Sequence, residues 1–189
     1  MKKFFKSLAV VSAIAIALFG FVACSDDDDD DNSSSLTPST VVVNGDSRVS
    51  LGELTTESTY VATVTEEDEG TTSTYKYTLT FYSESDSTKQ WKADYNVTAS
   101  GSGFSVNAWA TAMSGTFTGD STQDGEIEVT ATKAYTPNDD FTALETEELT
   151  DEEQLSEKFT ITNGKITIGI ESAFNFTGGE EEIVFEKQQ

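Results

Sequence analysis

Histidine is absent from this chain of 189 residues, and cysteine occurs only once, at Cys24. These two absences exclude catalytic arrangements that pair a serine or a cysteine with histidine, and zinc sites built from histidine and cysteine. No serine lies in a Gly-x-Ser-x-Gly turn, and no glycine-rich phosphate loop is present. A single cysteine forms no disulfide within the chain, so the fold depends on buried apolar surface and on backbone hydrogen bonds.

Basic residues are also scarce, because 11 lysines and arginines stand against 34 aspartates and glutamates, a formal net charge of −23. Such a chain repels the phosphates of nucleic acids, and we therefore expect no nucleic-acid partner. It attracts cations and cationic partners instead. A high net charge also serves simply to keep a protein soluble and monomeric, and we expect a monomer.

The many carboxylates raise two further hypotheses. A pair of them could hydrolyse glycosides, but 34 acids place such pairs by chance on any fold, and we expect no enzyme. Carboxylate oxygens also suit calcium. Contiguous acids on a strand point to opposite faces and do not converge on one ion, so we expect no metal site and no cofactor. A structural calcium stays open at the densest acidic runs, 66–69, 139–140 and 180–182.

The one long apolar run extends from Leu8 to Ala23 and follows three lysines. At about 16 residues it is shorter than the roughly 20 that a helix needs to cross a bilayer. Its order of charged, apolar and small residues is typical of a secretory signal. We expect residues 1–23 to be a signal peptide.

Phe21-Val22-Ala23-Cys24 closes this run and resembles the lipobox of bacterial lipoproteins, with Phe21 in place of the usual leucine. The resemblance implies cleavage before Cys24 and a triacylated Cys24. It therefore implies a lipid anchor in a bacterial outer membrane, with exposure at the cell surface left open. Two or more acyl chains anchor a protein stably, whereas one does not. Without residues 1–23 the chain keeps eight basic residues against 34 acidic ones, a net charge of −26.

Six aspartates and a polar run to about Ser39 follow Cys24. Low apolar content and like charges keep such a segment extended. An acidic run behind a lipidated cysteine also resembles the surface-export signals of Bacteroidota lipoproteins. We assign residues 24–52 to a disordered acidic tether and residues 53–189 to one domain, a length that suits a single hydrophobic core.

Beyond the tether, apolar and polar residues alternate with a period of two, the pattern of half-buried strands. The clearest runs are Tyr75–Tyr82, Trp91–Thr98 and Phe104–Thr111. Further strands are expected at 41–43, 60–64, 116–118, 126–134, 159–162, 165–170 and 183–186, and a short one at 173–176 is left open.

Turn residues separate these strands. Asn163-Gly164 is the strongest hairpin signal, because both residues tolerate positive φ. The run Thr150-Asp151-Glu152-Glu153 is a capping box and predicts one short helix. Eight to ten strands with one helix predict an all-β fold, an antiparallel meander barrel with a β-sandwich as the alternative.

Two parts of the mature chain resemble segments of small lipocalin-like β-barrel lipoproteins of Bacteroidota and spirochaetes. One is Gly115 to Asp120 followed by Asp124 to Ile127, and the other is 159–168 with 183–187. The resemblance covers roughly residues 57–187 and implies a lipocalin-like barrel of about eight strands. The Gly-x-Trp near the first strand of lipocalins is absent, so no ligand residue is carried over by position.

Candidate ligand-binding residues are therefore sought among the aromatic side chains. Tyr82 and Trp109 fall on the polar phase of their strands and are expected at the surface or at a barrel rim. Trp91 lies on the apolar phase and faces the interior. We take these three as the candidate ligand-binding residues.

Three functions are compatible with these features. The first is a non-enzymatic binding module for a small ligand or a glycan. Small residues on the apolar phase leave room for such a ligand in an eight-stranded barrel, namely Ala93, Ala108, Ala110 and Ala131. The second is a surface interaction or coat protein whose barrel is solid. The third is a carboxylate-based hydrolase.

Overall fold

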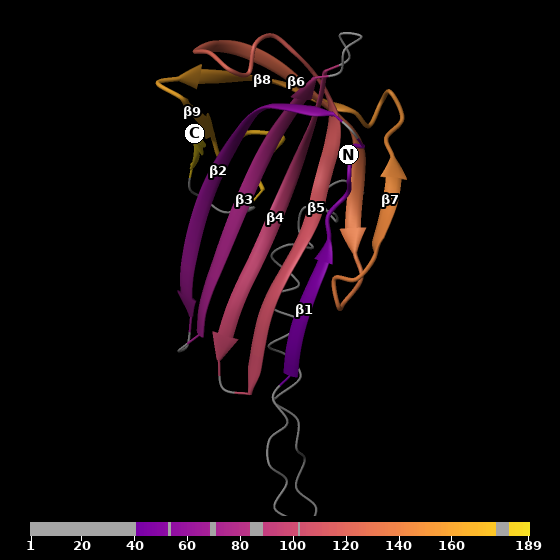
Figure 1. Ribbon diagram of the computed structural model, residues 1–189, viewed down its shortest axis with the longest axis vertical. Helices are drawn as coiled ribbons and strands as arrows, with labels where there is room; N and C mark the ends of the chain where they lie inside the picture. Colours follow the sequence, from indigo (N-terminus) through magenta and orange to yellow (C-terminus); the bar gives the residue numbers. More distant parts are fainter. Residues whose placement is uncertain (1–40, 53, 69–70, 84–88, 102, 177–181) are drawn as a thin grey trace, which may run out of the picture.

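A computed structural model describes residues 41–52, 54–68, 71–83, 89–101, 103–176 and 182–189 of the chain. Ten strands form one continuous sheet (Figure 1). Their bounds are β1 Val41–Ser47, β2 Thr55–Asp68, β3 Thr71–Ser83, β4 Lys89–Gly101, β5 Phe104–Thr118, β6 Gly125–Pro137, β7 Leu144–Glu148, β8 Leu155–Thr162, β9 Lys165–Ile168 and β10 Ile183–Lys187. The predicted signal peptide, Cys24 and the aspartate run lie outside the described residues.

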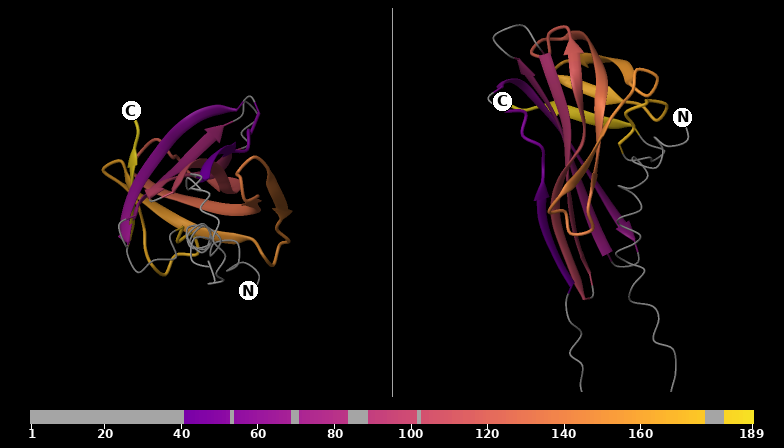
Figure 2. Two further views of the ribbon diagram at one scale, coloured as in Figure 1. Left: turned by 90° about the horizontal axis from the view of Figure 1, so that it is seen from below. Right: turned by 90° about the vertical axis from the view of Figure 1, so that its right-hand side faces the viewer.

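Eight of these strands close into an antiparallel barrel. Each strand pairs with the next along the chain from β2 to β6 and from β8 to β10, β6 pairs with β8, and β10 returns to β2. Viewed from below, the strands curve around a common axis (Figure 2). The expectation of an all-β, lipocalin-like meander barrel is confirmed, and the β-sandwich is not found. Within the described residues no helix could cross a membrane.

The predicted short helix is wrong. The capping box forms, since Glu153 Oε2 accepts from Thr150 N at 3.2 Å and from Thr150 Oγ1 at 2.9 Å. Only one turn follows, with Gln154 N donating to Thr150 O at 3.0 Å. Leu155 then starts β8 and pairs with Ala131 of β6. Strand pairing with β6 therefore overrides the local helix signal, and the described part of the chain contains no helix.

Strand β1 lies inside the segment 24–52 that was assigned to the tether. It pairs in parallel with β5 from Val41↔Phe104 to Ser47↔Ala110. It does so because β5 is 15 residues long and pairs with β6 only from Met113 onward. Without β1, the residues of β5 before Met113 would have no strand partner on the edge that faces β6 further along. The folded part of the described chain thus begins before residue 53.

Other boundaries also differ from the prediction. The separate strands expected at 104–111 and 116–118 form one strand, β5, which bends at an irregularity in its pairing between Ser114 and Gly115. Strand β7 has the acidic sequence LETEE, which lacks the alternation of apolar and polar residues that would have predicted a strand. It forms by pairing with the second half of β6. The segment 173–176 is a series of turns that carries Phe174 and Phe176 into the core.

The half of the barrel that contains β8–β10 lies toward the top of Figure 1. Aromatic and branched side chains pack in its interior. Phe174 packs edge-on against Trp91 and Phe159, with ring centroids 5.5 Å apart in both pairs. Loop 119–124 covers this end, because Ser121 is fully buried and its carbonyl accepts from the Tyr60 hydroxyl at 2.7 Å. Fully burying one such side chain contributes about 1.5–3 kcal/mol. This half supplies the main apolar core.

The lower half is built differently. Strands β2–β5 have 13 to 15 residues, whereas β8–β10 have four to eight and gather near the upper end (Figure 1). Strand β10 pairs with β2 only at Tyr60 and Val61. Below that level the second edge of β2, from Ala62 to Asp68, has no strand partner among the described residues. We call this part, formed by β1 and the lower halves of β2–β5, the sheet extension.

Candidate functional site

Strand register places three tyrosines together on the inner face of the sheet extension. Tyr77 stands directly opposite Tyr95 across β3 and β4, and Tyr75 stands opposite Val97 one inward position closer to the lower rim. All three are buried. The neighbouring inward positions are small, which is why three large rings fit on one face. We call this surface the tyrosine face; its small members are Ala62, Ala99, Ala108 and Ala110.

The Tyr95 hydroxyl is the one unusual polar group of this face. The side chain is 2 % exposed, and its hydroxyl is the only buried side-chain nitrogen or oxygen without a hydrogen-bond partner among the described residues. Other buried hydroxyls are satisfied; that of Tyr135, for example, lies 2.9 Å from Ser114 Oγ. An unsatisfied buried hydroxyl costs about 1–3 kcal/mol. Such a group in a native fold calls for an explanation.

The rings around Tyr95 form a continuous aromatic wall. Tyr77 stacks on Tyr75, with centroids 6.5 Å apart, and on Phe176, with centroids 6.1 Å apart. Phe141, from the loop between β6 and β7, meets Tyr95 edge-on at 6.5 Å. Phe141 approaches β1 so closely that a Cβ built on Gly45 would lie 2.5 Å from the Cβ of Phe141. Only glycine fits at that position of β1.

The phenols of the tyrosine face are neutral at physiological pH. Burial raises the pKa of Tyr95 and of Tyr77 well above the ordinary value, and for Tyr77 the charges of Tyr75 and Glu66 add to this. Burial, followed by Glu66, also raises the pKa of Tyr75. Glu66 lies at the lower rim, on the inward phase of β2 and opposite Ser73. The face therefore offers hydroxyl groups that both donate and accept, beside one carboxylate.

Trp91, a predicted ligand-binding residue, lies in the filled upper half instead. Its side chain is 0 % exposed, its Nε1 donates to Thr130 O at 3.1 Å, and its ring packs against Phe174. Every polar atom of the indole is thus satisfied by the protein. The structure gives Trp91 a packing role and separates it from Tyr82 and Trp109.

The outer face of the sheet carries a second group of residues beneath the segment 48–52, which we call the strap. The Lys92 ammonium lies 2.8 Å from Asp94 Oδ2 and donates to Val49 O of the strap at 2.9 Å. Thr111 Oγ1 donates to Asp94 Oδ1 at 2.6 Å and accepts from Val49 N at 2.8 Å. This network ties the strap to β4 and β5 and buries an ion pair on the outside of the barrel.

Trp109 lies on this outer face, as its polar phase predicts, and is half-buried. The Arg48 guanidinium sits over its ring at 4.5 Å, and the Lys76 ammonium lies 5.9 Å from the ring centroid. Asp46 holds Arg48 in place through two hydrogen bonds, of 2.9 and 2.6 Å. One side of the indole is thus occupied by Arg48, and these contacts help to hold the strap.

Tyr82 lines an open cleft of about 500 Å³ at the edge of the strap. Arg48 and Lys92 line the same cleft, and Arg48 also contacts Trp109, so two of the three predicted ligand-binding residues lie in one region. The sequence did not single out Arg48 or Lys92, because a basic residue on a polar phase has the pattern of an ordinary solvated side chain. Both are held by carboxylates, Arg48 by Asp46 and Lys92 by Asp94.

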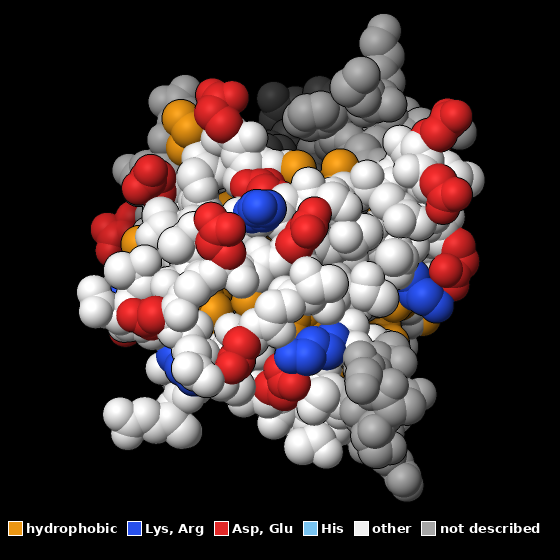
Figure 3. Space-filling view, turned by 90° about the horizontal axis from the view of Figure 1, so that it is seen from above, with side chains coloured by type: hydrophobic (Ala, Val, Ile, Leu, Met, Phe, Trp, Pro, Cys, Tyr) orange, Lys and Arg blue, Asp and Glu red, His pale blue; other side chains and the backbone are white. Residues whose placement is uncertain are grey.

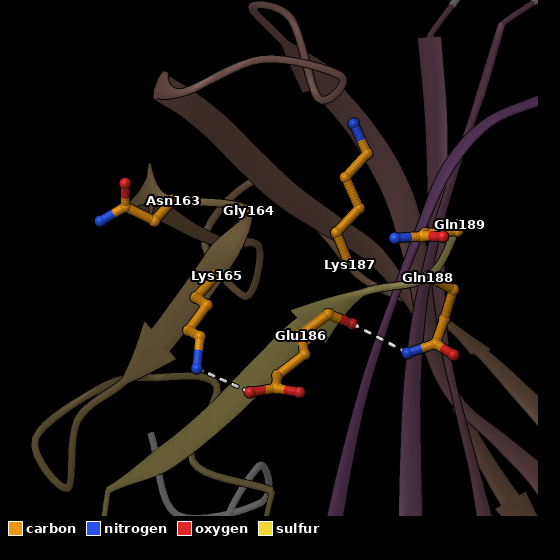
Figure 4. Close-up of a pocket in the computed structure, with 7 residues that line it drawn as sticks. All are labelled: Asn163, Gly164, Lys165, Glu186, Lys187, Gln188 and Gln189. Carbon is orange, nitrogen blue, oxygen red and sulfur yellow. Dashed lines mark hydrogen bonds and ion pairs between the residues drawn. The ribbon is translucent and has the colours of Figure 1, made fainter.

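Another hollow lies beside the Asn163-Gly164 hairpin and the C-terminal residues (Figure 4). Its charged groups are already paired, because Lys165 Nζ lies 2.6 Å from Glu186 Oε1 and Lys187 Nζ donates to Thr122 O. The Asn163 side chain points away from the others in Figure 4. Seen from above, this end of the molecule shows scattered acidic groups with few basic ones and only small apolar areas (Figure 3).

The described residues hold no group of three or more acids that could bind a metal ion. Glu66 and Glu67 follow one another on β2 and point to opposite faces. The Asp140 carboxylate accepts from the Thr142 hydroxyl at 2.6 Å, which shapes its own turn. Three further acids of the predicted runs, Glu69, Glu180 and Glu181, lie outside the described residues.

Comparison with known proteins finds no match. No family model, no curated protein and no solved structure matches the chain. Function is therefore argued from the residues and their geometry.

Proposed function

We propose that this protein is a non-enzymatic binding module of the lipocalin-like type, whose small ligand lies against the tyrosine face. The observation that carries this proposal is the Tyr95 hydroxyl, buried and without a partner among the described residues. A ligand with a hydrogen-bonding group would satisfy that hydroxyl and remove its cost of about 1–3 kcal/mol. Small ligand sites in proteins are mostly apolar, with a few polar groups that fix orientation.

The surroundings of Tyr95 support this location. Ala108 and Ala110 of β5 and Ala62 of β2 flank the tyrosines with the smallest side chains available to a strand. The wall beside Ala62 lacks a second strand partner in the described part of β2. The upper half, in contrast, is packed around Trp91 and Phe174. The proposal therefore confines the ligand to the lower half of the barrel.

The experiment is native mass spectrometry of the protein purified from the membrane of the bacterium that makes it. A bound ligand adds a defined mass that disappears on denaturation. In Tyr95→Phe the ring remains and the hydroxyl is lost, so the retained mass should fall or vanish. Tyr135→Phe is the matched control, because it removes a buried hydroxyl that has a partner, and it should retain the ligand.

A solid surface interaction protein is the second candidate, and the filled upper half of the barrel favours it. That function needs no retained ligand. If the wild-type protein carries no additional mass and Tyr95→Phe behaves identically, the interaction protein becomes the better account and the binding module is rejected.

We further propose that the domain works at a bacterial outer membrane, tethered through a triacylated Cys24. The lysines, the apolar run and the lipobox-like residues 21–24 support this, as does the stable anchoring that several acyl chains provide. Mass analysis of the N-terminal peptide should find Cys24 as the first residue, with three acyl chains. Cys24→Ala should leave the N-terminal segment uncleaved and without acyl chains.

A further inference from the structure

We infer that the ligand of the tyrosine face is a cationic amphiphile, a molecule with an apolar body and a protonated amine. This inference rests on the proposed function and specifies its ligand class. The argument uses three features of the inner face: its aromatic walls, its neutral phenols near the lower rim and the position of Glu66.

The charged groups of the face have one sign. Among the residues of the sheet extension whose side chains the structure describes, the inward positions of β2–β5 hold one carboxylate, Glu66, and no lysine or arginine; Asp68 follows on the same phase of β2. Lys76, which lies between Tyr75 and Tyr77 in sequence, points outward to Trp109. Glu66 pairs in register with Ser73 and has no ion-pair partner in the described part of the chain. An anionic ligand would meet an unpaired carboxylate here, and a cation would be stabilised by it.

The aromatic rings favour the same class. Tyr75, Tyr77 and Tyr95 form an aromatic cluster with Phe176 and Phe141. Ammonium groups bind well against several such rings, because the ring faces are electron-rich. A neutral phenol also accepts a hydrogen bond from an ammonium group. The phenols of Tyr75 and Tyr77 lie close enough to Glu66 for its charge to raise their pKa, after the larger effect of burial. The formal net charge of −23 draws cations toward the molecule from a distance.

The apolar body of the ligand is matched by the rest of the face. Val97, Ala99, Val106 and Ala108 are all buried and lie on adjacent rows of β4 and β5. An alkyl chain or a flat ring system against them would bury apolar surface on both partners. The inference thus places the charged end at the lower rim, near Glu66, and the apolar body along these residues in the direction of Tyr95.

The experiment compares three ligands with one ten-carbon chain: decylammonium, decanol and decanoate. They are titrated at neutral pH into residues 24–189 carrying Cys24→Ser, so that no acyl chain competes; this chain keeps every described residue. Isothermal calorimetry should show decylammonium binding about tenfold or more tighter than decanoate, with decanol between them, a preference equivalent to about 1.4 kcal/mol.

Neighbouring acids supply the matched control. Both side chains are exposed, but Glu66→Gln removes a charge on the inward phase and Glu67→Gln removes one on the opposite face of the same strand. Both change the net charge equally. The preference for decylammonium over decanoate should fall severalfold in Glu66→Gln and stay unchanged in Glu67→Gln.

Failure of the inference can be told from failure of the proposed function. Equal binding of all three ligands, or equal effects of the two glutamine variants, rejects the cationic class while leaving a binding module. If none of the ligands binds to the folded protein, the cationic amphiphile is rejected; the proposed function is rejected with it only where the native protein also carries no retained mass.

Discussion

The ring of Tyr95 stands edge-on to that of Phe141, with centroids 6.5 Å apart and ring planes at 78°. This contact joins β4 to the loop between β6 and β7, across the side of the barrel where β1 runs. Phe141 adopts a positive φ of 58° to reach that position, and Gly45 leaves the space that it needs. The loop thereby covers one side of Tyr95, while its hydroxyl stays without a partner among the described residues.

The first prediction concerns the stability cost of that hydroxyl. Tyr95→Phe should leave the free energy of unfolding unchanged or raise it by up to about 1 kcal/mol, since it removes an unsatisfied buried group. Tyr135→Phe breaks the bond to Ser114 and should lower that free energy by about 1 kcal/mol. Urea unfolding of the two variants measures both. A larger loss for Tyr95→Phe than for Tyr135→Phe would mean that the Tyr95 hydroxyl has a partner after all.

The buried ion pair beneath the strap should matter far more than a surface pair. Lys92 and Asp94 have side chains that are 11 % and 7 % exposed, so Asp94→Asn leaves a largely buried ammonium without its carboxylate. We expect a loss of about 3–5 kcal/mol in the free energy of unfolding. Glu186→Gln breaks the exposed pair with Lys165 and should cost less than about 1 kcal/mol. Equal losses, measured by urea unfolding, would contradict this.

Gly115 should be irreplaceable at the junction of β5 and β6. A Cβ at this position would lie 1.9 Å from the carbonyl oxygen of Thr130, a backbone atom that the β5–β6 pairing holds in place. Gly115→Ala should lower the free energy of unfolding by at least about 3 kcal/mol or prevent folding. Gly169→Ala is the control, because nothing lies within 4 Å of its Cβ position. Thermal unfolding followed by circular dichroism should show it within about 0.5 kcal/mol of wild type.

Acid should weaken the hairpin between β8 and β9 through Asp124. Its carboxylate accepts from Asn163 N at 2.7 Å and from Gly164 N at 3.1 Å, and these bonds hold the pKa of Asp124 below its ordinary value. A lowered pKa in the folded state stabilises the fold above the unfolded-state pKa. That contribution to stability is lost progressively as the pH falls from about 5 to below the lowered pKa of the folded state. Asp124→Asn should therefore show a flatter decline of stability between pH 5 and pH 2 than wild type, in urea unfolding at each pH. Parallel curves would exclude this role.

Much of the barrel could be predicted because its signals are local. The alternation around Tyr75, Trp91 and Val106 gave the correct inward faces, since a strand with one buried face must alternate. Asn163 and Gly164 adopt the predicted positive φ values of 53° and 69°. The capping box at Thr150 to Glu153 predicted a helix from local residues alone. Pairing of the following residues with β6, a strand distant in sequence, gave a strand instead.

The candidate site was less predictable, because it depends on register and on contacts between distant segments. Tyr82 and Trp109 lie on the expected outer face, but the sequence did not indicate that Arg48 covers Trp109. The sequence also showed that Tyr95 faces inward, yet whether its hydroxyl has a partner depends on every segment packed around it. Glu66 became relevant only when the β2–β3 register placed it at the rim of the same face.

The most direct test of ligand binding at the tyrosine face is a titration with the neutral dye N-phenyl-1-naphthylamine, whose fluorescence rises in apolar sites. Three forms of residues 24–189 are compared, each with Cys24→Ser: the otherwise unchanged chain, Ala108→Leu and Ser105→Leu. Ala108 is buried on the tyrosine face, and Ser105 is exposed on the opposite phase of β5. We predict saturable binding by the first and third forms, and at least about tenfold weaker binding by Ala108→Leu. Equal binding by all three folded forms, or no saturable binding at all, would contradict a ligand site on the tyrosine face.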